Sequence, residues 1–294
     1  MMPPPREESE LLKGFIAYLK ARGLSERTIK ENYSYKVRKF LEWLNLKRKN
    51  LEKVSLQDCY EFLSFIQEKR RLKNRTLITY IAGLTAFFDY LKLTKKIDNN
   101  PWKEVPRPRI EQTEIEFLDV EEIEKLIEIS EQLARDPITK VRDPLIIHFL
   151  FETGVRISEL CSLRWEDIDW KHREIKIRGK GGKERIVFIS LELAKRLRTW
   201  MLLSEPSFKD EPVLGISQRS VQRLMKKLSE ATGKRITAHM IRHSTATNLL
   251  KQGASVEAIR LLLGHSSLST TQKYMHLDRE GLREEWRKLF KKKD

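Results

Sequence analysis

Apolar residues recur at helical spacing in four successive segments of the first hundred residues. The segments begin near residues 11, 25, 55 and 74–76, and Ser25 and Ser55 stand where a helix N-cap is expected. Spacings of three and four residues place the apolar side chains on one face of each helix. Four such helices bury these faces against one another in a bundle. We therefore predict a four-helix domain over residues 1–98.

The residues that follow break this pattern. Residues 99–114 contain three prolines and show neither helical nor strand periodicity. Because proline biases the preceding residue toward extended conformations, we predict a stretched linker there. Helical spacing then returns, with Asp119 as an expected N-cap, Pro137 and Pro144 on either side of a predicted loop, and a buried helix over residues 145–151.

A short region of this second part changes to a period of two. E-I-K-I-R at 174–178 and R-I-V-F-I-S at 185–190 are rich in β-branched residues, and G-K-G-G-K at 179–183 joins them. This order of strand, glycine-rich turn and strand predicts a β-hairpin. We therefore predict a second domain over residues 115–294, and the fold class of the whole chain is mainly α with a small β-sheet in that domain.

The last predicted element is an amphipathic helix over residues 280–293. Leu282, Trp286, Leu289 and Phe290 form a narrow apolar stripe along it. Such an apolar stripe has to be buried against another surface, and there are two candidates for that surface. The helix covers either its own second domain or a neighbouring copy of the chain.

The charge of the chain indicates what kind of partner it binds. The 294 residues contain 58 Lys and Arg against 42 Asp and Glu, a net charge of +16. Residues 1–110 carry a net +11 of this excess and the remaining residues +5. A balance this basic predicts a polyanionic partner, most simply nucleic acid. An anionic membrane surface is the rival, but no long basic amphipathic helix without a core role supports it.

Basic residues of the first domain gather in two clusters. The predicted DNA-binding residues in these clusters are Lys47, Arg48, Lys49, Arg70, Arg71, Lys73 and Arg75. A charge run is often no more than a solvated helix end, and this interpretation stands beside the first one. The size of the excess favours contact with DNA phosphates.

Cysteine content and hydropathy indicate a cytoplasmic protein. Cys59 and Cys161 are too few for a disulfide framework, which fits a reducing compartment. The opening residues lack an apolar signal region, and the longest apolar run is far too short to span a bilayer.

Four polar residues between positions 237 and 274 are not required by the apolar pattern around them. His239 and Arg242 lie three apart and share a helix face. His265 directly follows Gly264, which is expected to end a helix, and Tyr274 lies on a predicted short helix after Ser269. Two helix ends and one helix face therefore bring four polar groups toward one pocket.

These residues belong to a longer set of motifs. In order, the chain contains T-G-V-R-I-S-E-L at 153–160, G-K-G-G-K-E-R at 179–185, H-M-I-R-H at 239–243, L-G-H-S-S at 263–267, and Tyr274 nine residues after His265. Together they resemble the active site of the tyrosine recombinases, the phage-integrase family. Within that family the Xer type, including its archaeal branch, is the most similar.

The resemblance implies a fold and an assembly. It implies that a helical DNA-binding domain and a catalytic domain form a C-shaped clamp around double-stranded DNA. It also implies a homotetramer on two specific DNA sites and a role in resolving chromosome dimers. The family works without a cofactor, so none is expected here.

It also assigns roles that suit phosphodiester chemistry. A phosphodiester needs a nucleophile, cationic donors for its non-bridging oxygens and an acid for the leaving oxygen. Arginine suits the donor role because its planar fork meets two phosphate oxygens and stays charged. The resemblance makes Tyr274 the nucleophile and Arg156 and Arg242 the phosphate clamp. Glu159 shares a helix face with Arg156 and supports Arg156 or His239.

The remaining roles go to two histidines and a lysine. His239 resembles the residue that assists proton removal from the tyrosine, and His265 the residue that hydrogen-bonds a non-bridging oxygen. Lys180 is the predicted general acid, since it matches the family's hairpin lysine. Lys183 remains its competitor, because spacing alone does not decide between them.

Three other interpretations of these residues stay open. A topoisomerase of type IB would use the same chemistry but reseal the same strand. A DNA-binding protein without catalysis would use the basic bundle and the helices of the second domain. His239 and His243 have zinc-like spacing, but Met240 stands where a metalloprotease motif has glutamate, so no metal site is predicted.

Overall fold

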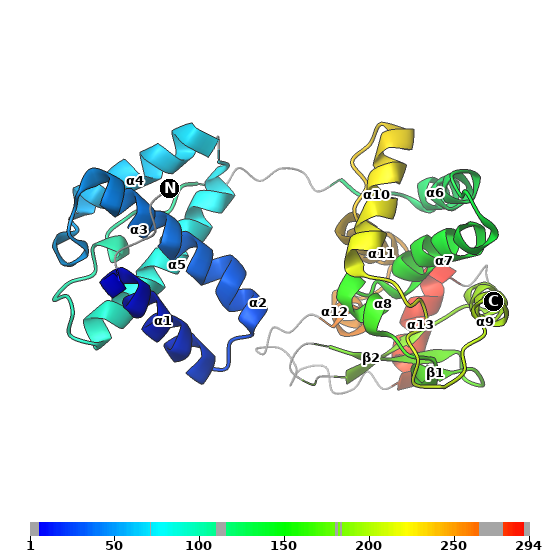
Figure 1. Cartoon of the computed structure of the whole chain (residues 1–294). Coiled ribbons are helices and arrows are strands. Elements are labelled where there is room, and N and C mark those ends of the chain that lie inside the picture. Colours follow the sequence, from blue (N-terminus) through cyan, green and yellow to red (C-terminus); the bar gives the residue numbers. More distant parts are fainter. Residues whose placement is uncertain are drawn as a thin grey trace. The chain divides into compact units, whose positions relative to one another are not determined.

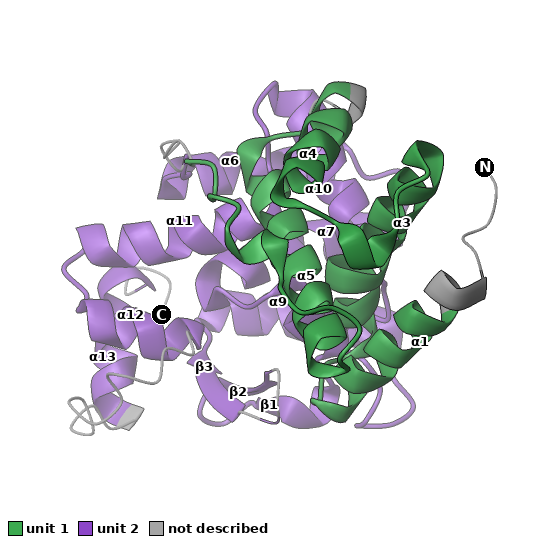
Figure 2. Cartoon of the chain, turned by 90° about the vertical axis from the view of Figure 1, so that its left-hand side faces the viewer, with its two compact units in different colours: residues 1–113 green, residues 114–294 purple. Residues whose placement is uncertain are grey.

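The computed structural model describes residues 6–70, 72–109, 116–179, 182, 184–264 and 279–290. The chain divides into two compact units, Met1–Thr113 and Glu114–Asp294 (Figures 1 and 2). Each unit has its own hydrophobic core. None of the helices in the described ranges is long and apolar enough to cross a membrane.

Unit 1 is built from the four predicted helical segments. Its elements are α1 (Arg6–Ala21), α2 (Glu26–Thr28), η1 (Ile29–Ser34), α3 (Tyr35–Lys47), η2 (Leu51–Lys53), α4 (Leu56–Arg70), α5 (Asn74–Leu93) and η3 (Pro101–Lys103). α2, η1 and α3 run on without a break, and η1 is a stretch of π-helix inside this second helical segment. Ser25 and Ser55 cap as expected, each accepting a hydrogen bond from the backbone three residues on. The prediction of four helices is confirmed.

The predicted linker differs from the structure in its first part. Trp102 is buried in the core of unit 1, edge-on to Phe40 and Phe62. The side chain of Asn100 fixes this turn, because its oxygen accepts the backbone N–H of Trp102 at 3.0 Å while its amide donates to Asp89 at 3.0 Å. Residues 99–105 therefore belong to unit 1, and the prediction that the linker begins at residue 99 is wrong. The sequence gives no periodic signal for these residues, because a single buried aromatic side chain does not form a repeating pattern.

Unit 2 is mainly helical, as predicted. Its helical elements are α6 (Val120–Gln132), α7 (Pro137–Thr153), α8 (Ile157–Ser162), η4 (Trp165–Asp167), α9 (Leu191–Ser204), α10 (Gln218–Thr232), α11 (Ala238–Lys251), α12 (Val256–Leu263) and α13 (Arg279–Phe290). Asp119 caps α6 through a capping box with Glu122. Gly253 and Gly264 both have positive φ just after α11 and α12, as their expected role at helix ends requires.

The expected loop between Pro137 and Pro144 is wrong. α7 starts at Pro137, capped by the side chain of Asp136, and continues through Pro144. Proline suits the first turn of a helix, but inside it removes one backbone hydrogen bond. The helix continues because residues 143–153 are all buried, so the apolar contacts of this turn offset the lost bond.

A three-stranded antiparallel sheet contains the predicted hairpin. The strands are β1 (Ile168–Asp169), β2 (Glu174–Arg178) and β3 (Glu184–Phe188), in the order β1-β2-β3. In the hairpin, Ile175 lies opposite Val187, and Ile177 lies opposite Arg185. Ile175, Ile177 and Val187 are buried in the core, whereas Lys176 and Glu184 lie on the exposed side.

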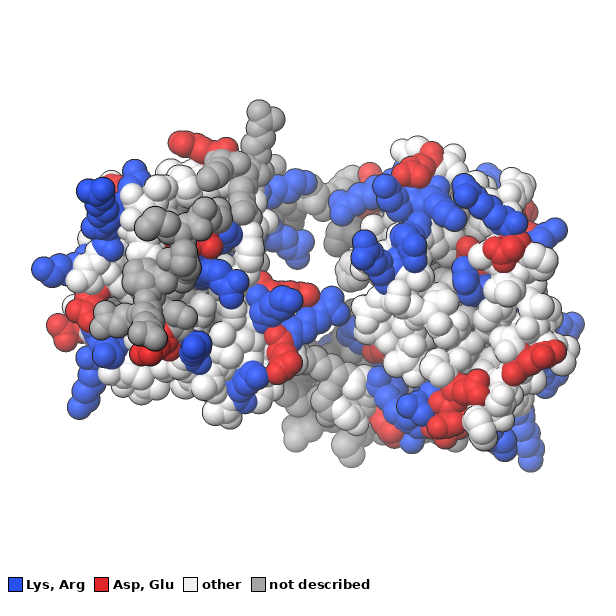
Figure 3. Space-filling model, in the orientation of Figure 1, with Lys and Arg blue, Asp and Glu red and all other residues white. Residues whose placement is uncertain are grey.

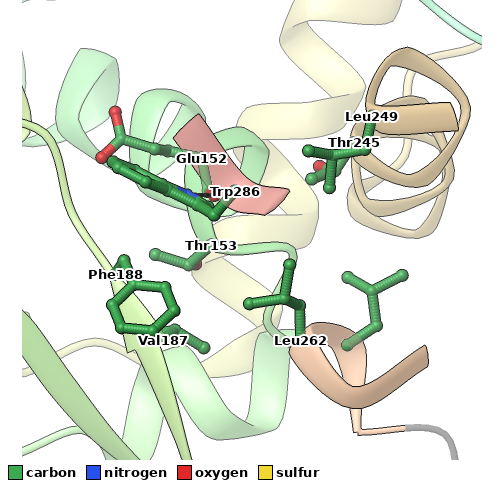
Figure 4. Close-up of a pocket in the computed structure, with 9 residues that line it drawn as sticks. Glu152, Thr153, Val187, Phe188, Thr245, Leu249, Leu262 and Trp286 are labelled. Carbon is green, nitrogen blue, oxygen red and sulfur yellow. Dashed lines mark hydrogen bonds between the residues drawn. The ribbon is translucent and has the colours of Figure 1, made fainter. Parts of the chain in front are cut away.

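The C-terminal helix α13 covers its own unit. Trp286 and Phe290 are buried, and the ring of Phe290 lies edge-on to Phe151 with the ring centroids 5.7 Å apart. Trp286 also donates its indole N–H to the carbonyl of Glu152 at 3.3 Å. Trp286 and Phe188 line one small cavity (Figure 4). Its volume of about 10 Å³ leaves room for at most one water. The sequence left open whether this helix covers its own domain or a neighbouring copy, and in this structure it covers its own domain.

Candidate active site

Arg156 and Glu159 form the first part of the candidate site, at the start of α8. Gly154 ends α7 with φ +58°, and a Cβ atom there would lie 2.3 Å from a methyl group of Leu263, so only glycine fits. The chain then turns into α8. Glu159 accepts the backbone N–H of Arg156 at 2.8 Å and its Nη1 at 2.9 Å. The predicted support of Arg156 by Glu159 therefore has direct contacts.

Glu159 is the electrostatic centre of this group. Its side chain is 4% exposed, and Arg185 of β3 adds two hydrogen bonds to the same carboxylate, at 3.0 and 2.8 Å. Burial alone would raise the pKa of Glu159, but the hydrogen bonds from Arg185 and Arg156 outweigh it and lower that pKa to about 2. The carboxylate stays ionised at neutral pH and holds two arginines in place.

Arg242 lies on α11 with its guanidinium buried. Its Nη1 donates to the carbonyl of Gly154, and its Nη2 donates to the carbonyl of Leu263 at 2.7 Å. Both carbonyls stand at helix ends, where backbone acceptors lack helical partners. Burial, and then the charges of Arg156 and Arg185, lower the pKa of Arg242 to about 10. Arg242 therefore remains a cation at neutral pH.

The end of α12 is held by three arginines. Arg185 donates to the carbonyl of Leu262 at 3.1 Å, Arg242 to that of Leu263, and Arg156 to that of Gly264 at 3.4 Å. Three successive carbonyls thus each have one arginine donor. His265 follows this segment directly in the sequence.

His239 lies in the first turn of α11, whose N-cap is Thr237. It is exposed, one turn before the buried Arg242 on the same helix. The pKa of His243 lies below its usual value because burial disfavours the charged ring and His239 adds to this. Within the described ranges, no three His, Cys, Asp or Glu residues are grouped as a metal site requires.

Three of the six predicted catalytic residues lie outside the described residues: Lys180, His265 and Tyr274, as does the competitor Lys183. Of the others, Arg156 and Arg242 meet at one junction with Glu159, and His239 lies on the helix that bears Arg242. Sequence reasoning missed Arg185, although it closes the quoted motif G-K-G-G-K-E-R. The sequence did contain a signal for it, because the alternation of the hairpin strand places Arg185 on the side that faces the core.

The predicted DNA-binding residues of unit 1 are in different environments. Lys47 is exposed at the end of α3, and Arg48 caps that helix in the left-handed conformation. Lys49 bonds both Asp58 and Glu61, and these hydrogen bonds raise its pKa. Lys49 is therefore engaged within unit 1, and its assignment to the DNA-binding set stays a prediction.

The second basic cluster is only partly described. Lys73 and Arg75 are exposed at the start of α5. The side chain of Arg70 and all of Arg71 lie outside what the structure describes. For this cluster the DNA-binding assignment stays a prediction.

Unit 2 has a basic helix face that the sequence analysis missed. Figure 3 shows Lys and Arg side chains gathered over α10. Its exposed cations are Arg219, Arg223, Lys226 and Lys227. The sequence shows these four cations at helical spacing. The prediction for this helix used only its apolar residues, which mark its buried face.

Sequence comparisons identify both units. Residues 116–280 match the Phage integrase family, and residues 11–97 match the phage integrase N-terminal SAM-like domain. The chain is 34% identical to the tyrosine recombinase XerA of Thermococcus kodakarensis, over 97% of this chain and 98% of that protein. It is also 34% identical to the tyrosine recombinase XerC of Syntrophus aciditrophicus, over 90% and 92%.

A solved structure agrees with these relatives. The crystal structure of the XerH site-specific recombinase bound to its difH substrate before cleavage is 26% identical, with a TM-score of 0.68. The match covers 94% of this chain and 83% of that one. The chain therefore belongs to the phage integrase family of tyrosine recombinases and is of the Xer type.

Proposed function

We propose that this enzyme is a site-specific DNA recombinase in which Tyr274 attacks a DNA phosphate. The tyrosine oxygen forms a 3′-phosphotyrosyl bond, and the bond to the 5′ oxygen breaks and leaves a 5′ hydroxyl. The 5′ hydroxyl of a second strand then attacks this bond and releases the tyrosine. Because the phosphoester is exchanged and not hydrolysed, the reaction needs no ATP. The arginines supply the positive charge that a metal ion would otherwise bring to the phosphate.

The observation that carries this proposal is the arginine junction around Glu159. Arg156 and Arg242 are cations fixed by hydrogen bonds at the end of α12, directly before His265 in the sequence. Fixed cationic donors lower the barrier at a phosphate because they need no reorganisation as charge develops. The side chain of Arg156 is 46% exposed, so it keeps N–H groups for a ligand. In this proposal Lys180 protonates the 5′ oxygen, and His239 and His265 assist.

The proposed partner is double-stranded DNA carrying a specific site. The net charge of +16 and the basic face of α10 support it, and the related XerH structure contains its DNA substrate. By resemblance to the Xer type, we propose that four copies act on two sites in the cytoplasm and resolve chromosome dimers. The C-terminal helix packs on its own unit in this structure, so assembly would require it to move or another surface to be used.

The rival functions are separated by the product formed. A type IB-like topoisomerase would relax supercoiled DNA without joining two sites, and a non-catalytic DNA-binding protein would do neither. The site is first identified as the duplex sequence that the protein selects from a random pool. The test then uses a plasmid that carries two direct repeats of this site. Recombination excises the intervening segment. Relaxation without excision would favour the topoisomerase.

The hairpin lysine provides a chemical test of roles. Lys180→Ala should slow cleavage of normal DNA by about 10²- to 10⁴-fold, the usual contribution of a general acid. It should slow cleavage of DNA with a 5′-bridging sulfur much less, because a thiolate leaves without a proton. Rates of covalent adduct formation on the two substrates measure this. If Lys183→Ala and not Lys180→Ala shows the rescue, the acid is Lys183.

The basic face of α10 should be visible in the salt dependence of binding. Replacing both Arg219 and Arg223 by alanine should reduce the slope of log affinity against log salt by about 1 for each phosphate that is no longer neutralised. Fluorescence anisotropy with a duplex of arbitrary sequence suffices, because this electrostatic effect is independent of sequence. Arg196→Ala on α9 is the control. An unchanged slope in the double variant would place α10 away from DNA.

A further inference from the structure

The side chain of Arg185 joins three segments of unit 2 that are far apart in the sequence. Its backbone lies in β3 and pairs with Ile177 of β2. Its two Nη atoms hold the carboxylate of Glu159 at 3.0 and 2.8 Å, and its Nε donates to the carbonyl of Leu262 at 3.1 Å. The hairpin, the start of α8 and the end of α12 therefore meet on one guanidinium.

We propose that Arg185 is a positioning residue for the recombination reaction, one that sets the hairpin lysine against the arginine clamp. This rests on the proposed function, because it assumes that a lysine of the hairpin acts on the DNA. The residues between β2 and β3 include both Lys180 and Lys183. Arg185 is two residues past Lys183, so its contacts fix the base of the segment that bears the acid.

The environment of Arg185 fits a positioning role. Its side chain is 12% exposed, and all three of its nitrogens donate to protein acceptors. A Cβ atom on Gly264 would lie 2.9 Å from its Cδ, so the glycine at the end of α12 leaves the room that this side chain fills. The side chain of Arg156, by contrast, is 46% exposed.

Only arginine can make this junction. Its planar fork bonds both carboxylate oxygens while the Nε points along a third direction. Lysine would keep the charge but offer one nitrogen in place of three. Glutamine would remove the charge as well, leaving Arg156 as the one residue of the described ranges that hydrogen-bonds the Glu159 carboxylate through a cationic side chain. In neither variant can residue 185 make all three hydrogen bonds to α8 and α12.

The test compares cleavage of normal DNA and of DNA with a 5′-bridging sulfur by the full-length protein. Displacement of a catalytic group by about 1 Å can cost ~10²-fold in rate. We therefore expect Arg185→Gln to form the covalent adduct about 100-fold more slowly on normal DNA, with DNA affinity unchanged. On the sulfur substrate the loss should be at least tenfold smaller, because the displaced acid is not needed there. A residue that only stabilised the fold would slow both substrates equally.

Two further variants complete the experiment. Arg196→Gln on α9 removes an arginine that pairs only with Glu192 among the residues described, and it should react like wild type. If Arg185→Gln does not fold, Arg185→Lys is used in its place. Its cleavage rate should again fall more on normal DNA than on the sulfur substrate, by a smaller factor than in Arg185→Gln. The proposal is overturned if the folded variant cleaves normal DNA within threefold of wild type, or is slowed equally on both substrates.

The same series separates this inference from the proposed function. Wild-type protein that forms no covalent adduct with either substrate would reject the function itself. Wild-type protein that forms the adduct, beside an Arg185 variant without the substrate difference, would reject only the role of Arg185.

Discussion

Tyr274→Phe protein is expected to bind DNA like wild type and to form no covalent protein–DNA product. The substitution removes only the attacking oxygen, so the interactions that give affinity stay in place. Loss of a nucleophile costs about 10⁴-fold or more in rate, even where the rest of an active site is intact. A denaturing gel after incubation with a nicked duplex detects the adduct, and anisotropy measures the affinity.

A matched control is available in unit 1. All six other tyrosines precede residue 91. Tyr60 is partly exposed on α4, and Tyr60→Phe should form the adduct at the wild-type rate. A covalent product from Tyr274→Phe would show that another residue is the nucleophile, whatever the control does.

Removal of residues 279–294 is expected to lower the stability of unit 2 severely. Trp286 and Phe290 are buried, and truncating one such aromatic residue to alanine costs about 3–5 kcal/mol. The whole stability of a domain is about 5–15 kcal/mol. Deletion would also leave the carboxylate of Glu174 without Arg283, which bonds it at 2.6 Å. The shortened protein should therefore unfold at a much lower temperature.

A milder substitution measures the same packing. Trp286→Ala should lower the melting temperature by roughly 10 °C, since about 1 kcal/mol corresponds to 2–4 °C for a domain of this size. Glu280→Ala on the exposed side of α13 is the control and should shift it by less than about 2 °C, because exposed ion pairs contribute little. If the shortened protein kept the melting temperature of the full chain, α13 would not belong to the core of its own unit in solution.

Local signals in the sequence were sufficient for most of the fold. The helices of unit 1, the caps Ser25, Ser55 and Asp119, and the β2–β3 hairpin follow from spacing and from residues that act on their immediate neighbours. The errors fall where tertiary contacts decide. Pro144 is accepted inside α7 because that turn is buried, and Trp102 ties part of the expected linker to unit 1.

The candidate site divides in the same way. Motif resemblance identified Arg156, Glu159 and Arg242, and the structure brings these three together. The acceptors of Arg242 could not be predicted, because the carbonyls of Gly154 and Leu263 are backbone groups without a signature in the sequence. The ion pairs of Lys49 could not be predicted for a related reason. Its carboxylate partners, Asp58 and Glu61, lie on α4 and reach it only in the folded bundle.

A covalent bond between Tyr274 and DNA can be identified by mass spectrometry. The protein is incubated with a nicked duplex that it has selected from a random pool, and the trapped product is digested and analysed by mass spectrometry. We expect a nucleotide attached through a 3′-phosphate to the peptide that contains Tyr274, formed without added metal. A nucleotide on any other residue, or cleaved DNA without a covalent peptide, would contradict this expectation.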